Sequence, residues 1–286
     1  MLNESSTRRI PFSRGFRADC HGISLIGSKR PVNQDQFFIA PLPGGGWNGL
    51  LGVADGIGGA PAGEWASRIV VETRRTFLEE ESSLLLRPER REDAILETLR
   101  RGLRRCHAAL QENVVRHPER SGLGTTLTAA LVLWPKLYLV HMGDSRAYLL
   151  REGSLRRLTE DHTYARTLLQ AGVLDARTVR TSGWNNVVWN VLSGAIPEHD
   201  PEVHPDASVQ ELHRGDTLLL CTDGLTNALS DEAILFHLAE EGSPEEICRR
   251  LVEAAQKRGA KDDVTGVVAA FHGPEPRSLR RKDGVS

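Results

Sequence analysis

The sequence is poor in cysteine, and its few cysteines form no metal-binding or disulfide pattern. They are Cys20, Cys106, Cys221 and Cys248, and no two of them stand at a CxxC or similar spacing. Structural zinc sites and disulfide frameworks both need such groupings, so neither is expected. The neighbouring residues are mostly apolar or helical, which predicts buried thiols in a reducing compartment.

An excess of one charge is also lacking. The 36 basic and 38 acidic residues leave a net charge of −2, so no basic face for binding nucleic acid is expected. Basic residues do cluster at the two ends of the chain: Arg8, Arg9, Arg14 and Arg17, then Arg277, Arg280, Arg281 and Lys282. We interpret these clusters as solvated tails rather than as a binding surface.

Long apolar runs are absent as well. No segment approaches the ~20 apolar residues that a membrane span requires. The opening segment, MLNESSTRRIPFSRGFR, lacks the apolar core of a signal peptide. We therefore expect a cytoplasmic protein with no membrane partner.

Length and composition fit one globular domain. Of the 286 residues, 40% are hydrophobic and 26% are charged, which is typical of a chain that buries a substantial core. No repeat, low-complexity block or linker divides the sequence, so a single domain is predicted over residues 19–272. Residues 1–18 and the basic segment 273–286 are predicted to be flexible tails, and we expect a monomer.

Strand-like segments occur in runs instead of alternating singly with helices. The expected strands are HGISLIGS, QFFIA, GLLGVAD, TTLTAALVLW, KLYLVHMG, RAYLLRE, SLRRLT, DTLLLCTDG and VTGVVAAF. Helices are predicted after Pro61, between Pro88 and Pro118, and in two segments after Asp223, the second opening with a capping box at Ser243. This order predicts an α+β fold of antiparallel sheets flanked by helices. The four strands in the middle of the chain are expected to form an antiparallel meander.

Aspartates recur where apolar strands begin or end. Asp55, Asp144 and Asp223 each follow a strand, whereas Asp262 and Asp263 precede the last one. Strand ends are rigid, so these carboxylates can converge at the rim of a sheet. A carboxylate cluster without His or Cys favours a hard cation, Mg²⁺ or Mn²⁺. Each Asp-Gly pair taken alone is also a common turn, so only the order and spacing of the whole set carry the interpretation.

That order and spacing resemble the bacterial-type members of the type 2C serine/threonine phosphatases, the metal-dependent protein phosphatase family. The matching segments are RPVNQD (30–35), VADGIGG (53–59), AGE (62–64), AS (66–67), GTT (124–126), GDSR (143–146), TDGL (222–225) and KDDVT (261–265). The resemblance covers roughly residues 20–271 and implies a four-layer α-β-β-α sandwich of two antiparallel sheets.

The resemblance also implies a set of metal ligands. Two Mn²⁺ or Mg²⁺ ions would be held by Asp55, the Gly56 carbonyl, Asp223 and Asp262, with Asp55 bridging both ions. The glycine after Asp55 lets its backbone carbonyl approach an ion. Asp144 matches the residue that, together with Asp223, holds a third, weaker ion in similar enzymes.

Two further positions match residues that act beside the metals, and three depart from the family pattern. Arg30 corresponds to the residue that binds the substrate phosphate, and Asp35 to one that contacts the site through water or hydrogen bonds. Gln34 stands where many relatives have glutamate, and Asp263 replaces a frequent asparagine. Ile57 occupies the place of a histidine proposed as general acid in eukaryotic members, so the proton donor to the leaving group is unassigned.

The implied activity is hydrolysis of phosphoserine and phosphothreonine in proteins that a serine/threonine kinase has phosphorylated. Two cations lower the pKa of a shared water, and the resulting hydroxide attacks phosphorus in line. No cysteine lies in a CxxxxxR loop, which argues against a cysteine nucleophile. Two alternatives share the fold or the chemistry: a catalytically silent phosphoprotein-binding module, and a metal-dependent hydrolase of small phosphate esters. A silent module would not need to keep its metal ligands.

Some residues resemble site residues but have simpler interpretations. We expect His162 to be a surface or capping histidine. His199 and His204 lack the spacing of a zinc site and are expected in a solvated loop. Trp184 and Trp189 fall in a segment that forms a flap beside the active site in the family. Packing of that flap is favoured for both, with substrate contact as the alternative.

Overall fold

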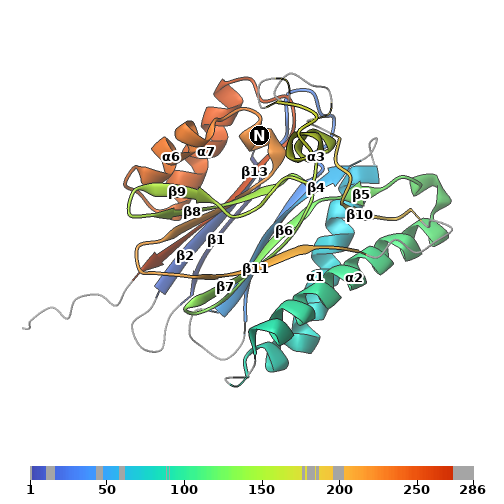
Figure 1. Ribbon diagram of the computed structural model, residues 1–286, viewed down its shortest axis with the longest axis horizontal. Helices are drawn as coiled ribbons and strands as arrows, with labels where there is room; N and C mark the ends of the chain where they lie inside the picture. Colours follow the sequence, from blue (N-terminus) through green and yellow to red (C-terminus); the bar gives the residue numbers. More distant parts are fainter. Residues whose placement is uncertain are drawn as a thin grey trace, which may run out of the picture.

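Two antiparallel β-sheets lie face to face in the computed structural model, and helices cover both outer faces (Figure 1). The structure describes residues 2–10, 17–42, 48–57, 62–87, 89, 91–175, 178, 184, 187–195 and 203–272. Every strand pairing in these ranges is antiparallel. The predicted α+β fold, a four-layer α-β-β-α sandwich, is confirmed.

The first sheet has the strand order β1-β2-β13-β12-β8-β9. Its strands are β1 (Leu2–Ile10), β2 (Arg17–Leu25), β8 (Arg146–Arg151), β9 (Ser154–Arg157), β12 (Thr217–Cys221) and β13 (Val264–His272). The second sheet has the order β10-β5-β4-β6-β7-β11, and β3 also pairs with β4. Its strands are β3 (Asp35–Pro41), β4 (Asn48–Ile57), β5 (Gly124–Thr125), β6 (Leu127–Leu133), β7 (Lys136–Met142), β10 (Leu192–Ser193) and β11 (Asp206–Glu211).

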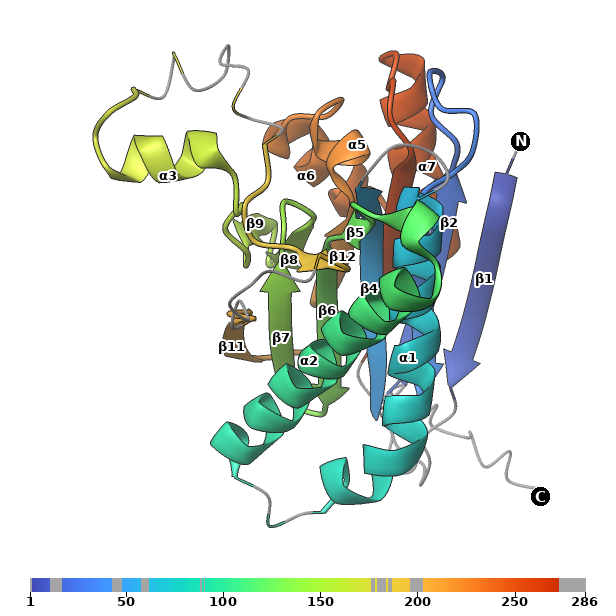
Figure 2. The same ribbon diagram turned by 90° about the vertical axis from the view of Figure 1, so that its right-hand side faces the viewer.

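A pair of long helices covers the second sheet, and a shorter group covers the first (Figure 1). The long pair is α1 (Ala62–Leu85) and α2 (Glu92–Arg116), followed by the 3₁₀ turn η1 (Pro118–Arg120). The shorter group is α5 (Asp223–Thr226), α6 (Asp231–Ala239) and α7 (Pro244–Lys257). Helix α3 (Tyr164–Gln170) stands away from the sheets at one end of the molecule (Figure 2). The predicted capping box at Ser243 is present at the start of α7.

The core has three layers because the central strands are apolar on both faces. In β12, Leu218 and Leu220 point between the two sheets, whereas Leu219 packs under α5–α7. In β6, Ala130 lies between the sheets and Leu131 lies under α1 and α2. Since successive side chains of a strand alternate between its faces, a continuous apolar run fits a sheet covered on both sides.

The N-terminal segment differs from the prediction. Residues 1–18 were expected to form a flexible tail, but Leu2–Ile10 form β1, which pairs with β2 at the edge of the first sheet (Figure 2). An edge strand is held by backbone hydrogen bonds, which need no apolar pattern in its sequence. The predicted tail 273–286 and the positions Gly58, Gly59, Pro61 and Pro88 lie outside the described residues.

The predicted meander is also wrong in one respect. Strands β6 and β7 form a hairpin, and so do β8 and β9, but β7 and β8 belong to different sheets. The Gly143-Asp144-Ser145 connection therefore crosses from one sheet to the other. This crossing places Asp144 at the end of the sandwich where β4 and β12 also end.

Candidate metal centre

Asp35 and Asp55 face each other across two neighbouring strands. They are register partners at the first residue of β3 and near the last residue of β4. Thr126 holds the Asp55 backbone, accepting a hydrogen bond from the Asp55 N–H at 3.0 Å and donating its own N–H to the Asp55 carbonyl at 2.8 Å. Thr126, which lies between β5 and β6, thus fixes the Asp55 backbone before any ligand is considered.

Asp35 is buried and is held by two threonines of the opposite sheet. Thr222 and Thr265 donate their hydroxyls to Asp35 Oδ2 at 2.8 and 2.7 Å. Burial raises the pKa of Asp35 to about 8, although both hydroxyl bonds act in the other direction. These contacts tie the two sheets together beside Asp55. Neither threonine was singled out from the sequence for this role.

Asp223 is the first residue of α5, directly after β12. Asn227, one turn later, donates its side-chain Nδ2 to Asp223 Oδ2 at 3.0 Å. The other oxygen, Oδ1, is buried and has no hydrogen-bond partner among the described residues. A buried carboxylate oxygen without a donor is costly unless something positive binds it.

The neighbouring Asp262 and Asp263 have different partners. Asp263 is buried and accepts backbone N–H groups from Gly27 and Gln34, both at 2.8 Å, so it holds the loop before β3. Asp262 is partly exposed, and Arg30 binds it with two parallel bonds of 2.6 and 2.7 Å. Asp262 is thus held by a side chain, whereas Asp263 is held by backbone groups of the loop.

Arg30 lies within the carboxylate group. Its Nε and Nη2 donate to Asp262, while its Nη1 donates to Gln34 Oε1 at 3.0 Å. The hydrogen bonds to Asp262, followed by the charges of Asp263 and Asp55, raise the pKa of Arg30. Gln34, which departs from the family pattern, thus orients the arginine through its amide oxygen.

Asp144 completes the group from the crossing between β7 and β8. Its side chain is buried, and its pKa is raised well above the usual value, first by desolvation and next by the charge of Asp223. Ser145, the next residue, shares a 2.8 Å hydrogen bond with Thr126, the same threonine that holds Asp55. The loop carrying Asp144 is thereby attached to the strand that supports Asp55.

The carboxylates destabilise one another's charged forms. Desolvation comes first for both Asp55 and Asp223, and it raises the pKa of each. For Asp55 the charges of Asp35 and Asp223 add to it, and for Asp223 the charge of Asp262 does so. Crowded, partly dehydrated carboxylates of this kind are what a divalent cation stabilises.

The donor set fits a hard cation in composition, while the side chains do not form a complete coordination shell. All the candidate side-chain donors are carboxylate oxygens, as Mg²⁺ and Mn²⁺ prefer, and one of them is the unpartnered Asp223 Oδ1. In the described part of the chain, no three His, Cys, Asp or Glu side chains are grouped closely enough to hold an ion. Asp262 is bound to Arg30 instead.

Gly56 is required by close backbone packing. A Cβ at this position would lie 2.2 Å from the Gly63 carbonyl oxygen at the start of α1, so no other residue fits. Its own carbonyl oxygen also faces Gly63. The sequence suggested a glycine for approach to an ion, and the structure adds the contact between β4 and α1 as a further reason.

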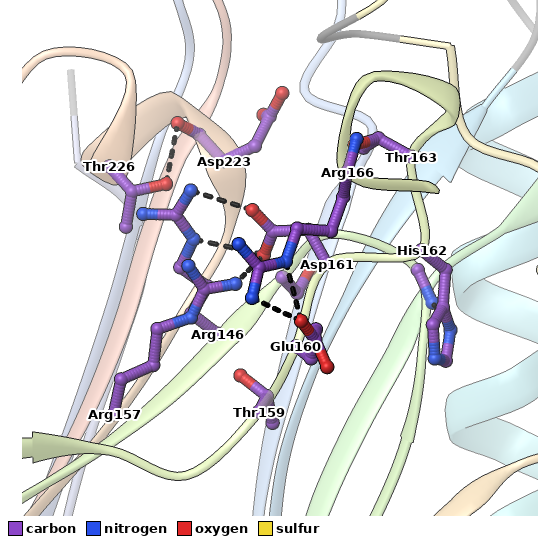
Figure 3. Close-up of polar contacts among 12 residues, drawn as sticks. Arg146, Arg157, Thr159, Glu160, Asp161, His162, Thr163, Arg166, Asp223 and Thr226 are labelled. Atoms are coloured by element: carbon purple, nitrogen blue, oxygen red, sulfur yellow. Dashed lines mark hydrogen bonds and ion pairs between the residues drawn. The ribbon is translucent and has the colours of Figure 1, made fainter. Parts of the chain in front are cut away.

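An ion cluster lies beside the site, on the segment that follows β9 (Figure 3). Asp161 accepts two hydrogen bonds from Arg146, at 3.0 and 2.7 Å, and a further one from Arg157. Arg166 of α3 pairs with Glu160 in the same segment. A cavity of about 510 Å³ is lined by Arg157 and Arg166 together with His141 and Asp206. None of the aspartates of the candidate metal centre lines it.

Comparison with known proteins identifies the family. The sequence matches the family model for protein phosphatase 2C over residues 26–267. The chain belongs to the protein phosphatase 2C family.

Named members of the phosphatase 2C family include close relatives of this chain. The serine/threonine protein phosphatase PstP of Mycobacterium tuberculosis is 37% identical over 222 residues, which cover 77% of this chain and 40% of that protein. The serine/threonine phosphatase stp of Listeria welshimeri is 32% identical over 214 residues, covering 74% of this chain and 81% of that protein. This chain therefore spans less than half the length of PstP but most of the listerial protein.

A solved structure from the phosphatase 2C family has the same fold. The crystal structure of the PstP catalytic domain in complex with two manganese ions superposes with a TM-score of 0.73 at 33% identity. The superposition covers 90% of this chain and 99% of that domain. The four-layer arrangement is thus the arrangement of this family.

The histidines and tryptophans give a mixed result. The sequence predicted a surface or capping position for His162. The structure instead buries it, at 6% exposure, and its side chain has three polar neighbours. Trp184 and Trp189 are about half exposed, packing on Tyr164 and on His162 respectively. His204 lies in the described chain before β11, and His199 lies outside the described residues.

Two further sequence expectations can be compared with the structure. All four cysteines are buried and free, as expected. Among the described residues, none of the helices has both the length and the apolar character needed to cross a bilayer.

Proposed function

We propose that this chain hydrolyses phosphoserine and phosphothreonine in proteins, with divalent cations held at the aspartate cluster. The observation that carries the proposal is the convergence of Asp55, Asp144, Asp223 and Asp262 at one end of the sandwich, with one buried Asp223 oxygen unpartnered. Its support from relatives is the phosphatase activity named for PstP and stp and the two manganese ions in the PstP structure.

The proposed ligands of two Mn²⁺ or Mg²⁺ ions are Asp55, the Gly56 carbonyl, Asp223 and Asp262. Asp144, with Asp223, is the proposed site of a third, weaker ion. When bound, such cations polarise a phosphoryl group and lower the pKa of a coordinated water.

The chain's own residues orient the substrate and the ligands. Arg30 presents a planar fork that already binds a carboxylate through two parallel bonds, and the same geometry suits two phosphate oxygens. Asp35, held by its two threonines, keeps Asp55 in place from the neighbouring strand. Asp263 anchors the loop that carries Arg30.

The biological setting is part of the same proposal. We infer a cytoplasmic monomer, with a catalytic domain ending at residue 272, acting on the products of a serine/threonine kinase. Four buried, unpaired cysteines support a reducing compartment. The family match over residues 26–267 supports the extent of the domain.

One set of assays on the purified full chain with Mn²⁺ distinguishes the proposed function from the two alternatives, a hydrolase of small phosphate esters and a catalytically silent binding module. Turnover of phosphothreonine peptides far above that of small phosphate esters supports the proposal. The reverse preference would indicate a hydrolase of metabolites. Tight binding of the phosphopeptide without release of phosphate would indicate a silent recognition module.

A further inference from the structure

His162 is a buried side chain with a complete set of partners and no role in the site described above. Its ring lies between the Gly143 backbone and the Asp206 side chain. Its Nδ1 is 3.2 Å from the Gly143 backbone nitrogen and 3.1 Å from Asn190 Nδ2, and its Nε2 is 3.2 Å from Asp206 Oδ2. The ring also packs on Trp189 at a centroid distance of 5.3 Å.

These partners assign the tautomer of the ring. A backbone N–H can only donate, so Nδ1 must accept the hydrogen bond from Gly143. The proton then resides on Nε2, which donates it to Asp206. A carboxylate partner on one ring nitrogen is a common way to fix which nitrogen accepts.

Gly143 is held by His162 through two hydrogen bonds. The Gly143 N–H donates to the ring, and the Gly143 carbonyl accepts the His162 backbone N–H at 2.8 Å. Gly143 has φ of +112°, a conformation that glycine adopts readily, and it begins the crossing between the sheets. Asp144 is the next residue. Its position is therefore set by His162 on one side and by the Ser145–Thr126 bond on the other.

The same histidine is attached to the segment that carries Trp189. The Trp189 backbone N–H donates to the His162 carbonyl at 3.0 Å, and Thr163 forms a β-bridge with Val188. The preceding residue, Asp161, is held in the opposite direction by Arg146 and Arg157. The short segment 161–163 is therefore fixed from both sides.

We propose that His162 is a positioning residue that holds the Gly143 turn so that Asp144 can bind its cation. The inference rests on the proposed function, since it assigns His162 to the weaker of the proposed metal sites. His162 does not touch the metals or the substrate in this account. It acts through the Gly143 backbone, with Asp206 selecting the tautomer.

Three variants of His162 separate positioning from packing. In His162→Asn, the amide oxygen can stand where Nδ1 stands and accept the Gly143 N–H. In His162→Gln the amide reaches the Nε2 position instead, and in His162→Leu both contacts are lost. His107 provides a matched control, because it is also 6% exposed and its Nδ1 accepts a backbone N–H, that of Ser193, at the same 3.2 Å.

The measurement is calorimetric titration of the metal-free full chain with Mn²⁺. The parent is expected to show two tight binding events and one weaker event. In His162→Leu and His162→Gln the weaker event should lose about tenfold in affinity while the tight events stay, and His162→Asn should recover most of it. His107→Leu should lose stability without changing any Mn²⁺ affinity. An unchanged weaker event in His162→Leu, or an equal loss in His107→Leu, would overturn the inference.

NMR of the metal-free chain provides a readout that does not depend on the proposed function. The Gly143 amide proton should move upfield in His162→Leu, and the parent ring should show an unprotonated Nδ1. A protonated Nδ1 in the parent would overturn the inference even if three Mn²⁺ ions bind. A parent that binds no Mn²⁺ would overturn the proposed function, and the inference would fall with it.

Asp206→Ala covers the case in which His162→Leu fails to fold. The Asp206 side chain is 62% exposed, so its removal is compatible with folding. Losing this acceptor should let part of the ring population carry its proton on Nδ1 and weaken the third Mn²⁺ event about threefold. An unchanged ring tautomer together with an unchanged Mn²⁺ affinity would contradict the proposal.

Discussion

At the residue scale, Asp223 should respond to neutralisation in an unusual way. Asp223→Asn removes a proposed metal ligand, so turnover should be abolished. The raised pKa of Asp223 shows that its charged form is disfavoured in the folded chain. A carboxyl with a raised folded pKa binds its proton more tightly when folded, so its charge lowers stability as the pH rises above the unfolded pKa. In chelator at neutral pH the variant should therefore melt at or above the parent temperature.

Asp216 is the matched control for that experiment. It is also buried, but Arg151 binds both of its oxygens, and it accepts the His213 N–H. Asp216→Asn breaks a charge pair and should lower the melting temperature. Equal losses of stability in Asp223→Asn and Asp216→Asn, measured by thermal unfolding in chelator, would mean that Asp223 is a structural residue.

Arg30→Ala tests phosphate binding. Removing a charge-assisted, two-bond contact to the substrate predicts a loss of roughly ten- to hundredfold in kcat/KM. Arg151→Ala is the control. Arg151 binds Asp216 through the same two atoms, Nε and Nη2, at 2.8 and 2.7 Å. This pair lies where β8 ends and β12 begins, at the strand ends far from the aspartate cluster. Steady-state kinetics on a phosphothreonine peptide should show the loss only in Arg30→Ala. An unchanged efficiency in Arg30→Ala would remove Arg30 from the site.

The individual site residues were predictable only to the extent that their motifs are local in sequence. The candidate ligands Asp55, Asp144, Asp223 and Asp262 were all proposed from their positions at strand ends together with the family resemblance. The choice of Asp262 over its neighbour was not settled by sequence alone and stays a prediction, which the two backbone N–H groups on Asp263 favour. Gly27 and Gln34 are more than 200 positions from Asp263 in the sequence. Contacts over such a separation leave no signal in a single sequence.

His162 illustrates the same limit. A histidine after a charged pair in a polar stretch, TEDHT, is typical of an exposed loop. It is buried because the segment before β11 returns over it, and this return depends on pairing between β7 and β11. No local pattern encodes that contact.

At the element scale, most strands and helices agree with the sequence prediction. Apolar runs such as TLLLC and LTAALVL predict strands that are covered on both sides, and both lie in central positions. The exceptions include β1, whose polar sequence LNESSTRRI has no strand-like alternation, and the passage from β7 to β8. Elements α3, β10 and β11 were not predicted, and three helices follow β12 where two were expected. A turn sequence indicates where a strand ends, but not which sheet the chain enters next.

Strand β7 carries a pH-sensitive group. Burial lowers the pKa of His141 to about 4, and the Nε2 of His141 donates to the Glu160 carbonyl. Between pH 6.5 and about 4, His141 therefore binds fewer protons in the folded state than in the unfolded state. The contribution of His141 to stability must then fall as the pH falls through this window, by about 2 kcal/mol between pH 6.5 and 5. Carboxyls with a raised pKa, such as Asp35, act in the opposite direction.

His141→Leu isolates this contribution. The variant is less stable at neutral pH because Thr128 and the Glu160 carbonyl lose their partner. Between pH 6.5 and 5 the stability of the parent should nevertheless fall more, or rise less, than that of the variant, since the aspartates titrate alike in both proteins. Urea unfolding of the two chains in chelator at several pH values measures the difference. Parallel pH profiles would contradict the assigned role of His141.

At the scale of the whole molecule, the position of the site follows from the topology. Strands β4 and β12 run toward one end of the sandwich, and β3 and β13 start there. Asp55, Asp223, Asp35 and Asp262 lie at or next to those strand ends. The crossing between the sheets brings Asp144 to the same end. The antiparallel arrangement was predictable from runs of strands, whereas the convergence of these ends required the family resemblance.

The cysteines provide an internal control for the chemistry. All four are buried, and burial raises the pKa of Cys106, Cys221 and Cys248 to about 12. A thiol with so high a pKa remains protonated and unreactive near neutral pH. Alkylating reagents should therefore leave the folded protein active, which separates this chemistry from that of a cysteine nucleophile.

The most direct test is release of orthophosphate from a phosphothreonine peptide by the purified full chain after its metals have been removed. We expect no turnover in excess chelator, full turnover when Mn²⁺ is restored, and the same rate after thiol alkylation under native conditions. Undiminished turnover in chelator would contradict the metal-dependent account, and so would loss of activity on alkylation.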